Sequence, residues 1–190
     1  ALMGGMGRSF DGSYAEYALL PRHHVFPVDT ELSWIEMGAV PETYYTAWGS
    51  LMQRLQLKCD DTLLIRGASC ALGYAAMQLA KALGCKIIAT THWDKHLHLL
   101  QEGGADESVL VEPGGIVCHT GVLGNVFAFQ SFSPLNHIPN GVYLTGFHSN
   151  DPTDDDLRDI FSFIDKYNLK PLTGAVYRFD DIRQALIDLD

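Results

Sequence analysis

The sequence predicts an α/β fold with a parallel β-sheet, preceded by part of a second, β-rich lobe. Two short apolar segments, 62–66 and 86–91, are each followed by a stretch with helical spacing. A turn of small residues, 67–73, joins the first strand to its helix. Strands that alternate with helices of this length form parallel sheets.

The start of the chain is not part of this alternating pattern. Residues 12–20 alternate loosely between apolar and polar side chains and end at Pro21, which predicts a strand. Residues 25–28 predict a second, short strand. We therefore expect residues 1–32 to be a remnant of a β-rich lobe.

Residues 33–58 have the pattern of helices that connect two lobes. Apolar side chains recur at spacings of three and four from Trp34 to Leu55, and Pro41 begins a new helical segment. The parallel sheet then occupies residues 59–150. Its expected elements are a strand at 62–66, a helix that ends at Gly84, a strand at 86–91, a helix from Asp94 to about Glu102 and a strand at 107–111.

The pattern is interrupted after this third strand. Residues 116–119 predict another buried strand, but only the four residues 112–115 precede it, and a parallel crossover needs about a dozen. Either the two strands form an antiparallel hairpin or a segment is missing near 111/112, and we expect a missing segment. Beyond it we expect a strand at 142–146.

The last part of the chain, 151–190, predicts two helices. The acidic stretch 153–156 is typical of a helix start, and residues 179–182 begin a last helix that stops at Asp190.

Composition and charge exclude several classes of function. The formal net charge is -10 and the 13 Lys and Arg residues are scattered, so a nucleic-acid surface is not expected. No apolar run reaches the roughly 20 residues that span a bilayer. The four cysteines are widely spaced, so neither a zinc knuckle nor a disulfide framework is expected. We expect a soluble, cytoplasmic protein.

The turn after the first strand fits a phosphate-binding site. A Rossmann-type dinucleotide site needs small residues there, because the N–H groups of the following helix must approach the pyrophosphate. Of the G-x-G-x-x-G pattern only the last glycine is kept. The alternative is a turn that merely joins a strand to a helix. The candidate cofactor-binding residues are Ala68, Ser69, Cys70, Ala71, Leu72 and Gly73.

The end of the second strand distinguishes NADP from NAD. A carboxylate there binds the ribose 2′-hydroxyl of NAD and repels a 2′-phosphate. This chain instead has Thr91 and His92, with Lys95 shortly after, and their hydroxyl, imidazole and ammonium groups favour NADP(H). The alternative role of Lys95 is a solvated helix residue, and that of His92 is a surface loop residue. Asp94 is interpreted as a helix cap.

Motifs along nearly the whole chain resemble the medium-chain dehydrogenase/reductase family, in its zinc-independent, quinone reductase-like branch. They are Gly-Ser-Tyr-Ala-Glu-Tyr at 12–17, Val-Pro-Glu-Thr-Tyr-Tyr-Thr-Ala-Trp at 40–48, Arg-Gly-Ala-Ser-Cys-Ala-Leu-Gly at 66–73, Gly-Ala-Asp at 104–106, Pro-Gly-Gly-Ile-Val at 113–117 and Tyr-Arg-Phe-Asp-Asp-Ile at 177–182. The resemblance implies a GroES-like catalytic lobe beside a Rossmann domain, with 151–190 returning to the catalytic lobe. It also implies that most of the N-terminal lobe, a middle segment and a final strand are missing.

The resemblance also implies cofactor contacts by position. Thr46 resembles the helix residue beside the nicotinamide, Gly121, Val122 and Leu123 resemble the loop that holds the carboxamide, and Phe147 lies where the next strand opens onto the cleft. Each of these residues has packing or turn formation as its alternative role. Tyr44 and Tyr45 are the candidate catalytic residues, as hydrogen-bond donors lining the cleft. The alternative for both is a buried core tyrosine with one hydrogen bond.

The expected function is hydride transfer from NADPH to a quinone or an α,β-unsaturated carbonyl compound. No metal is expected, because Glu42 stands where zinc-dependent relatives place a cysteine ligand. The alternatives are a zinc-dependent alcohol dehydrogenase and a non-catalytic dinucleotide-binding protein. The resemblance also makes a homodimer a possible assembly.

Overall fold

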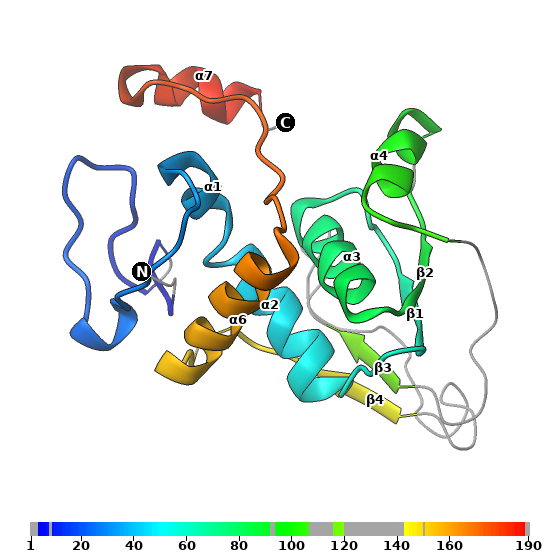
Figure 1. Cartoon of the computed structure of the whole chain (residues 1–190). Helices are drawn as coiled ribbons and strands as arrows, with labels where there is room; N and C mark the ends of the chain where they lie inside the picture. The colour runs from blue at the N-terminus through cyan, green and yellow to red at the C-terminus, as the bar shows by residue number, and fades with distance from the viewer. Residues whose placement is uncertain are drawn as a thin grey trace, which may run out of the picture. The chain divides into compact units, whose positions relative to one another are not determined.

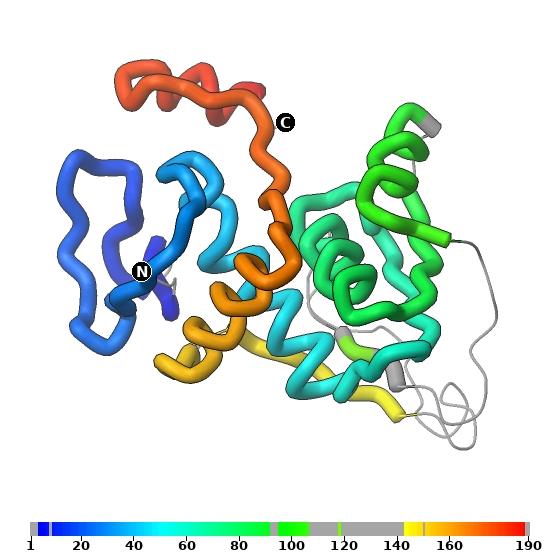
Figure 2. The backbone as a smooth tube through the Cα atoms, viewed as in Figure 1, coloured from blue at the N-terminus to red at the C-terminus, as the bar shows by residue number. Residues whose placement is uncertain are grey.

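The structure is a computed structural model of the 190-residue chain. It describes residues 4–7, 9–91, 94–106, 116–119, 143–149 and 151–188 (Figure 2). The chain forms two compact units. The first combines 1–42 with 150–190, and the second, 43–149, contains both pairs of parallel strands.

The centre of the second unit is a strand–helix–strand motif (Figure 1). Strands β1 (Thr62–Ile65) and β2 (Lys86–Ala89) pair in parallel, with Thr62 opposite Lys86. Helix α3 (Ala71–Leu83) connects them and packs against both. Its buried face consists of small and apolar side chains, and the helix ends at Gly84, whose φ of 92° suits glycine. These elements confirm the predicted α/β fold with a parallel sheet.

A second parallel pair of strands also lies in this unit. Strand β3 (Ile116–His119) pairs with β4 (Tyr143–Gly146), with Ile116 opposite Tyr143. Both strands lie where the sequence predicts them. The predicted strand at 107–111 lies outside the described residues, so the two explanations of the short connection stay predictions.

Helices line the second unit beside these strands. Helix α2 (Thr43–Trp48) packs against α3 and continues into the π-helix η2 (Gly49–Arg54), which contacts β4. After β2 come the 3-10 turn η3 (Asp94–His96) and helix α4 (Leu97–Glu102). The helix predicted from Asp94 to Glu102 is therefore split into two short pieces.

The first unit contains the short turn η1 (Arg22–His24), helix α1 (Trp34–Ala39) and helix α6 (Asp154–Tyr167), followed by η4 (Phe179–Asp181) and α7 (Ile182–Ile187). The predicted acidic helix start is confirmed. Thr153 accepts a hydrogen bond from the Asp156 amide, and the Asp156 carboxylate accepts one from the Thr153 amide.

The two predicted strands near the start of the chain are wrong. Residues 12–20 form bends and extended chain, and 25–28 are extended without strand pairing. Tyr17 and Leu19 are 90% and 93% exposed. The described residues of this unit pair only through an isolated bridge between Met6 and Phe10. A strand needs a neighbour to accept its backbone hydrogen bonds, so alternation alone does not produce one.

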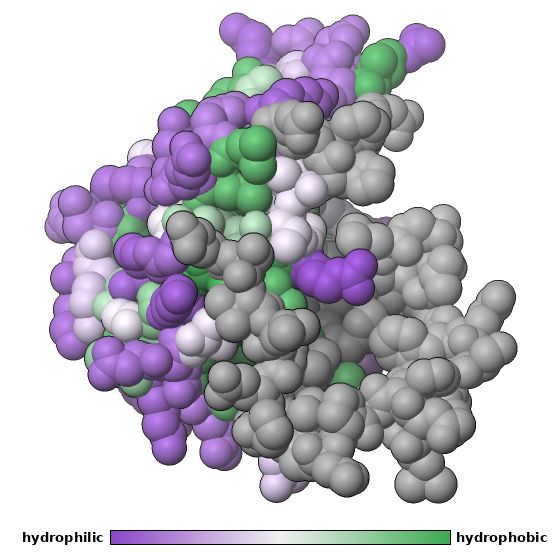
Figure 3. Space-filling view, turned by 90° about the vertical axis from the view of Figure 1, so that its right-hand side faces the viewer, coloured by the Kyte–Doolittle hydropathy of each residue, from purple (hydrophilic) through white to green (hydrophobic). Residues whose placement is uncertain are grey.

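Polar side chains cover much of the described surface. On the face shown in Figure 3 the described residues are mostly hydrophilic, with smaller hydrophobic areas between them. Within the described part of the chain, no helix is both long and apolar enough to cross a membrane.

Candidate dinucleotide-binding site

The predicted phosphate-binding turn lies directly beyond β1 and is tied to the end of β2. The Ala68 amide donates to the Thr90 carbonyl at 2.9 Å, and the Thr90 amide donates to the Ile65 carbonyl at 3.0 Å. Gly67 has a φ of 68°, a left-handed conformation that glycine adopts without strain. The turn therefore lies at the carboxyl ends of two parallel strands, where α/β folds bind their ligands.

Gly73 allows helix α3 to begin close to this turn. A Cβ atom at Gly73 would lie 2.5 Å from the Ala68 Cα atom and 2.9 Å from both its carbonyl carbon and its carbonyl oxygen. All three are backbone atoms, so they cannot rotate away as the end of a side chain could. The last glycine of the motif is thus required by close packing of the helix on the turn.

Cys70 caps the N-terminus of α3. Its sulfur accepts a hydrogen bond from the Gly73 amide at 3.4 Å, and its carbonyl accepts one from the Tyr74 amide at 2.9 Å. The amides of Ala71 and Leu72 belong to the first turn, where a helix provides no internal acceptor. Cys70 and Ala71 are exposed, so an anion can approach this positive helix end.

Two hydroxyl groups meet beside the turn. The side-chain oxygens of Ser69 and Thr91 are 3.0 Å apart, within hydrogen-bond distance. Ser69 comes from the turn and Thr91 from the segment just after β2. Lys95 follows on η3 and is exposed. The described end of β2 thus presents hydroxyl groups at the position where a carboxylate would select NAD.

Thr46 on helix α2 has a buried hydroxyl group that no described residue pairs. The residue is 8% exposed, and its Oγ1 has no hydrogen-bond partner among the described residues. The Thr46 carbonyl accepts a hydrogen bond from the Ser50 hydroxyl at 2.6 Å, which holds the backbone. Buried polar groups are nearly always paired, and an unpaired one costs about 1–3 kcal/mol. A bound ligand can supply the missing partner.

Phe147 lies just after β4 and packs against the α2–η2 junction. Its ring fills the space where a side chain at Gly49 would project. It meets the Tyr45 ring edge-on, with centroids 5.7 Å apart, and the Arg54 guanidinium lies 6.0 Å from its centroid. Phe147 is buried, so the structure gives its ring a packing role at this junction.

The two candidate catalytic tyrosines are both buried. Tyr44 is 1% exposed, and its hydroxyl donates to Oε1 of Gln78 on α3. Burial raises the pKa of Tyr44 above its ordinary value of 10.0, and the nearby Tyr74 raises it further. The Tyr44 hydroxyl is therefore a neutral donor already engaged within the protein.

Known proteins are similar to this chain in sequence. The chain is 32% identical to a quinone oxidoreductase of Pongo abelii and 33% identical to that of Homo sapiens, in each case over 99 residues, which are 52% of this chain and 30% of the relative. Over about half of its length, the chain is thus a homologue of quinone oxidoreductases. A zinc-type alcohol dehydrogenase-like protein of Schizosaccharomyces pombe is 31% identical over 103 residues, so the zinc-independent branch stays a prediction. No family model matches the chain.

Solved structures of an alcohol dehydrogenase and a quinone oxidoreductase have a similar fold. A putative alcohol dehydrogenase from Sinorhizobium meliloti 1021 superimposes with a TM-score of 0.83 at 22% identity, covering 97% of this chain and 64% of that one. The quinone oxidoreductase from Thermus thermophilus, which was also solved with NADPH, gives 0.72 at 21% identity, covering 94% and 70%. The alignments to the curated quinone oxidoreductases span about a third of each relative's length.

The predicted cofactor residues fall into two groups. The turn residues, Thr46, Thr91, Lys95 and Phe147 are described, and all belong to the second unit. The predicted contacts His92, Gly121, Val122 and Leu123 lie outside the described residues. Sequence reasoning missed Ser50 and Gln78. Ser50 follows Thr46 by four residues, a spacing that signals contact on a helix, whereas nothing local connects Gln78 to Tyr44.

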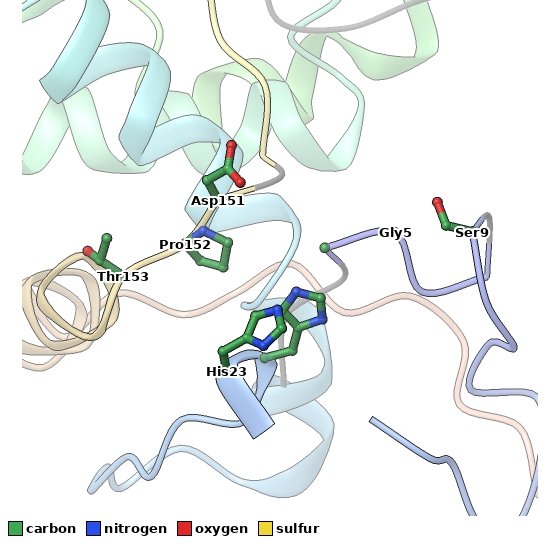
Figure 4. A pocket seen from close by; sticks show the side chains of 8 residues that line it. Gly5, Ser9, His23, Asp151, Pro152 and Thr153 are labelled. Atoms are coloured by element: carbon green, nitrogen blue, oxygen red, sulfur yellow. The ribbon is translucent and has the colours of Figure 1, made fainter. Parts of the chain in front are cut away.

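The first unit has a cavity of its own, of about 710 Å³ (Figure 4). Ser9, His23, Asp151 and Thr153 are among its lining residues. Asp151 precedes helix α6, whose first turn carries three further aspartates. Among the described residues, no three or more His, Cys, Asp or Glu side chains are grouped to hold a metal ion.

Proposed function

We propose that this protein is an NADP(H)-dependent oxidoreductase that transfers hydride from NADPH to a quinone or an α,β-unsaturated carbonyl compound. The observation that carries the proposal is the Thr46 hydroxyl, which is buried and has no partner among the described residues. It lies in the same unit as the turn whose close packing requires glycine at position 73. The quinone oxidoreductase relatives support the reaction and the substrate class.

The residues present fit a nicotinamide dinucleotide. The first-turn amides of α3 would bind the pyrophosphate, and Thr46 would bind near the nicotinamide. A cofactor hydroxyl or carboxamide would pair the buried Thr46 oxygen. When bound, the cofactor supplies the hydride, and the protein supplies binding and orientation. The NADPH complex of the Thermus thermophilus quinone oxidoreductase supports this cofactor.

NADP(H) is proposed over NAD(H) because of the residues after β2. The hydroxyls of Ser69 and Thr91 lie 3.0 Å apart, and the one that accepts in this pair can donate its own proton to a 2′-phosphate. The Lys95 ammonium can neutralise part of the phosphate charge. An NAD-dependent alcohol dehydrogenase is also a structural neighbour, at 26% identity and a TM-score of 0.68. The choice between the two cofactors therefore depends on these residues and not on the fold.

The proposed reaction needs no metal and no dedicated general acid. Hydride addition to an enone or quinone leaves an enolate or phenolate, which water can protonate. The zinc-independent branch, the homodimer and the cytoplasmic location expected from the sequence all stay predictions. One zinc ion per chain in elemental analysis would favour the zinc-dependent alternative.

The experiment is a steady-state assay of NADPH oxidation at 340 nm with a panel of quinones and enones. We expect saturable turnover with at least one acceptor, and slower turnover with NADH at equal concentration. A Gly38→Ala variant is the control for the effect of a substitution as such. Its activity should equal that of the wild type, because a side chain at Gly38 meets nothing within 4 Å. Tight NADPH binding without turnover of any acceptor would instead indicate a non-catalytic dinucleotide-binding protein.

A further inference from the structure

We infer that the hydrogen bond from Tyr44 to Gln78 is a positioning link, which fixes where the nicotinamide end of the cofactor site lies relative to its phosphate end. The inference rests on the proposed function and assigns a role to a residue pair that is not itself in the cofactor site. Tyr44 and Gln78 are 34 residues apart in sequence and lie on two different helices.

The link joins the two helices that carry the two halves of the site. Tyr44 lies on α2, two residues before Thr46, and Gln78 lies on α3, five residues after Gly73. Helices α2 and α3 pack directly against each other (Figure 1). The bond is therefore a short, direct connection between Thr46 and the helix start that would hold the phosphates.

Apolar packing alone would not fix the relative position of these helices so closely. Small and apolar side chains such as Ala47, Ala75 and Met77 are buried on them, and hydrophobic burial has no directional preference. A hydrogen bond has strict distance and angle requirements, so it defines one register between the helices. Misplacement of a binding group by about 1 Å can lower activity by roughly 100-fold.

The chemistry of Tyr44 suits a permanent link. The side chain is buried, and burial together with the nearby Tyr74 raises its pKa, so the hydroxyl keeps its proton throughout the physiological range. The bond is thus not switched by pH. Ser50 on η2 donates to the Thr46 carbonyl, while no described residue pairs the Thr46 hydroxyl, which can therefore bind a ligand.

The test is the Tyr44→Phe variant, which removes one oxygen atom and keeps the ring. Dissociation constants are measured for two probes, NADPH and adenosine 2′,5′-bisphosphate. The second probe resembles only the adenosine half of NADPH with its phosphates and lacks the nicotinamide half. We expect the dissociation constant of NADPH to rise by about 3- to 10-fold and that of the bisphosphate to stay within about 2-fold. A merely structural role would not produce this split.

Gln78→Met tests the other partner, and it serves alone if Tyr44→Phe does not fold. The double variant should bind NADPH no more weakly than either single variant, because the same bond is lost in each. Tyr177→Phe is the matched control, since it also removes a tyrosine hydroxyl that donates to a side chain, Asp188, but in the other unit. We expect its two dissociation constants to match those of the wild type.

Three results would overturn the inference: unchanged NADPH binding in Tyr44→Phe, equal weakening of both probes, or additive losses in the double variant. Failure of the proposed cofactor site looks different, because the wild-type protein would then bind neither probe before any substitution is made. Binding without turnover would refute the proposed reaction and leave this inference to be decided by the two dissociation constants.

Discussion

Gly73→Ala tests the close packing of helix α3 on the phosphate-binding turn. The added Cβ would lie 2.5 Å from the Ala68 Cα atom and 2.9 Å from the Ala68 carbonyl carbon and oxygen. Overpacking costs about 1–3 kcal/mol. Because the opposing atoms are backbone, we expect about 2 kcal/mol, which changes the unfolding equilibrium roughly 30-fold.

The assay is urea unfolding followed by far-UV circular dichroism, together with an NADPH titration. Movement of the helix away from the turn should weaken NADPH binding as well as stability. The matched control is Gly38→Ala on α1, where a Cβ meets nothing within 4 Å. Because alanine favours helix over glycine, that change should be neutral or stabilise by up to about 1 kcal/mol. Equal stability of the Gly73→Ala variant and the wild type would refute the packing argument.

Three further substitutions test individual groups. Cys70→Gly releases the Gly73 amide from the cysteine sulfur, so NADPH should bind about 2- to 5-fold more tightly, and weaker binding in the titration would contradict this. Thr46→Val removes a buried hydroxyl that has no partner among the described residues, so NADPH binding should weaken about 3- to 10-fold. Urea unfolding should show equal or greater stability, and lower stability would mean that the hydroxyl is already satisfied within the protein. Burial and the nearby Asp61 raise the pKa of the Cys85 thiol from 9.0 to about 11. The folded protein therefore keeps this proton to a higher pH than the unfolded chain does, and the free energy of unfolding should fall as the pH rises from about 9 to 11. Cys85→Ala should flatten that part of the curve of unfolding free energy against pH, and an unchanged slope would exclude Cys85 as its source.

The strand–helix–strand motif could be predicted because its signals are local. The apolar run that begins at Thr62, the small residues before α3 and the glycine after Leu83 each specify their own structure. The prediction failed for residues 12–20, where loose alternation suggested a strand. Strand formation depends on a pairing partner, and the described residues provide none there.

The candidate site could be predicted only in part, for the same reason. The turn and Thr91 were found because they stand at fixed places after two strands. The Tyr44–Gln78 bond joins residues that are 34 apart, and the π-helix at Gly49–Arg54 follows a pattern that ordinary helical spacing also fits. The unpaired state of the Thr46 hydroxyl depends on everything packed around it, so no sequence pattern reveals it.

We propose above that the second unit binds a dinucleotide and prefers NADPH to NADH. The most direct test of this proposal is a parallel fluorescence titration of the wild-type protein and a Thr91→Asp variant with both reduced cofactors. We expect the wild type to bind NADPH at least about 10-fold more tightly than NADH, and the new carboxylate to reverse this order. Binding of neither cofactor by the wild-type protein would contradict a dinucleotide site in the second unit.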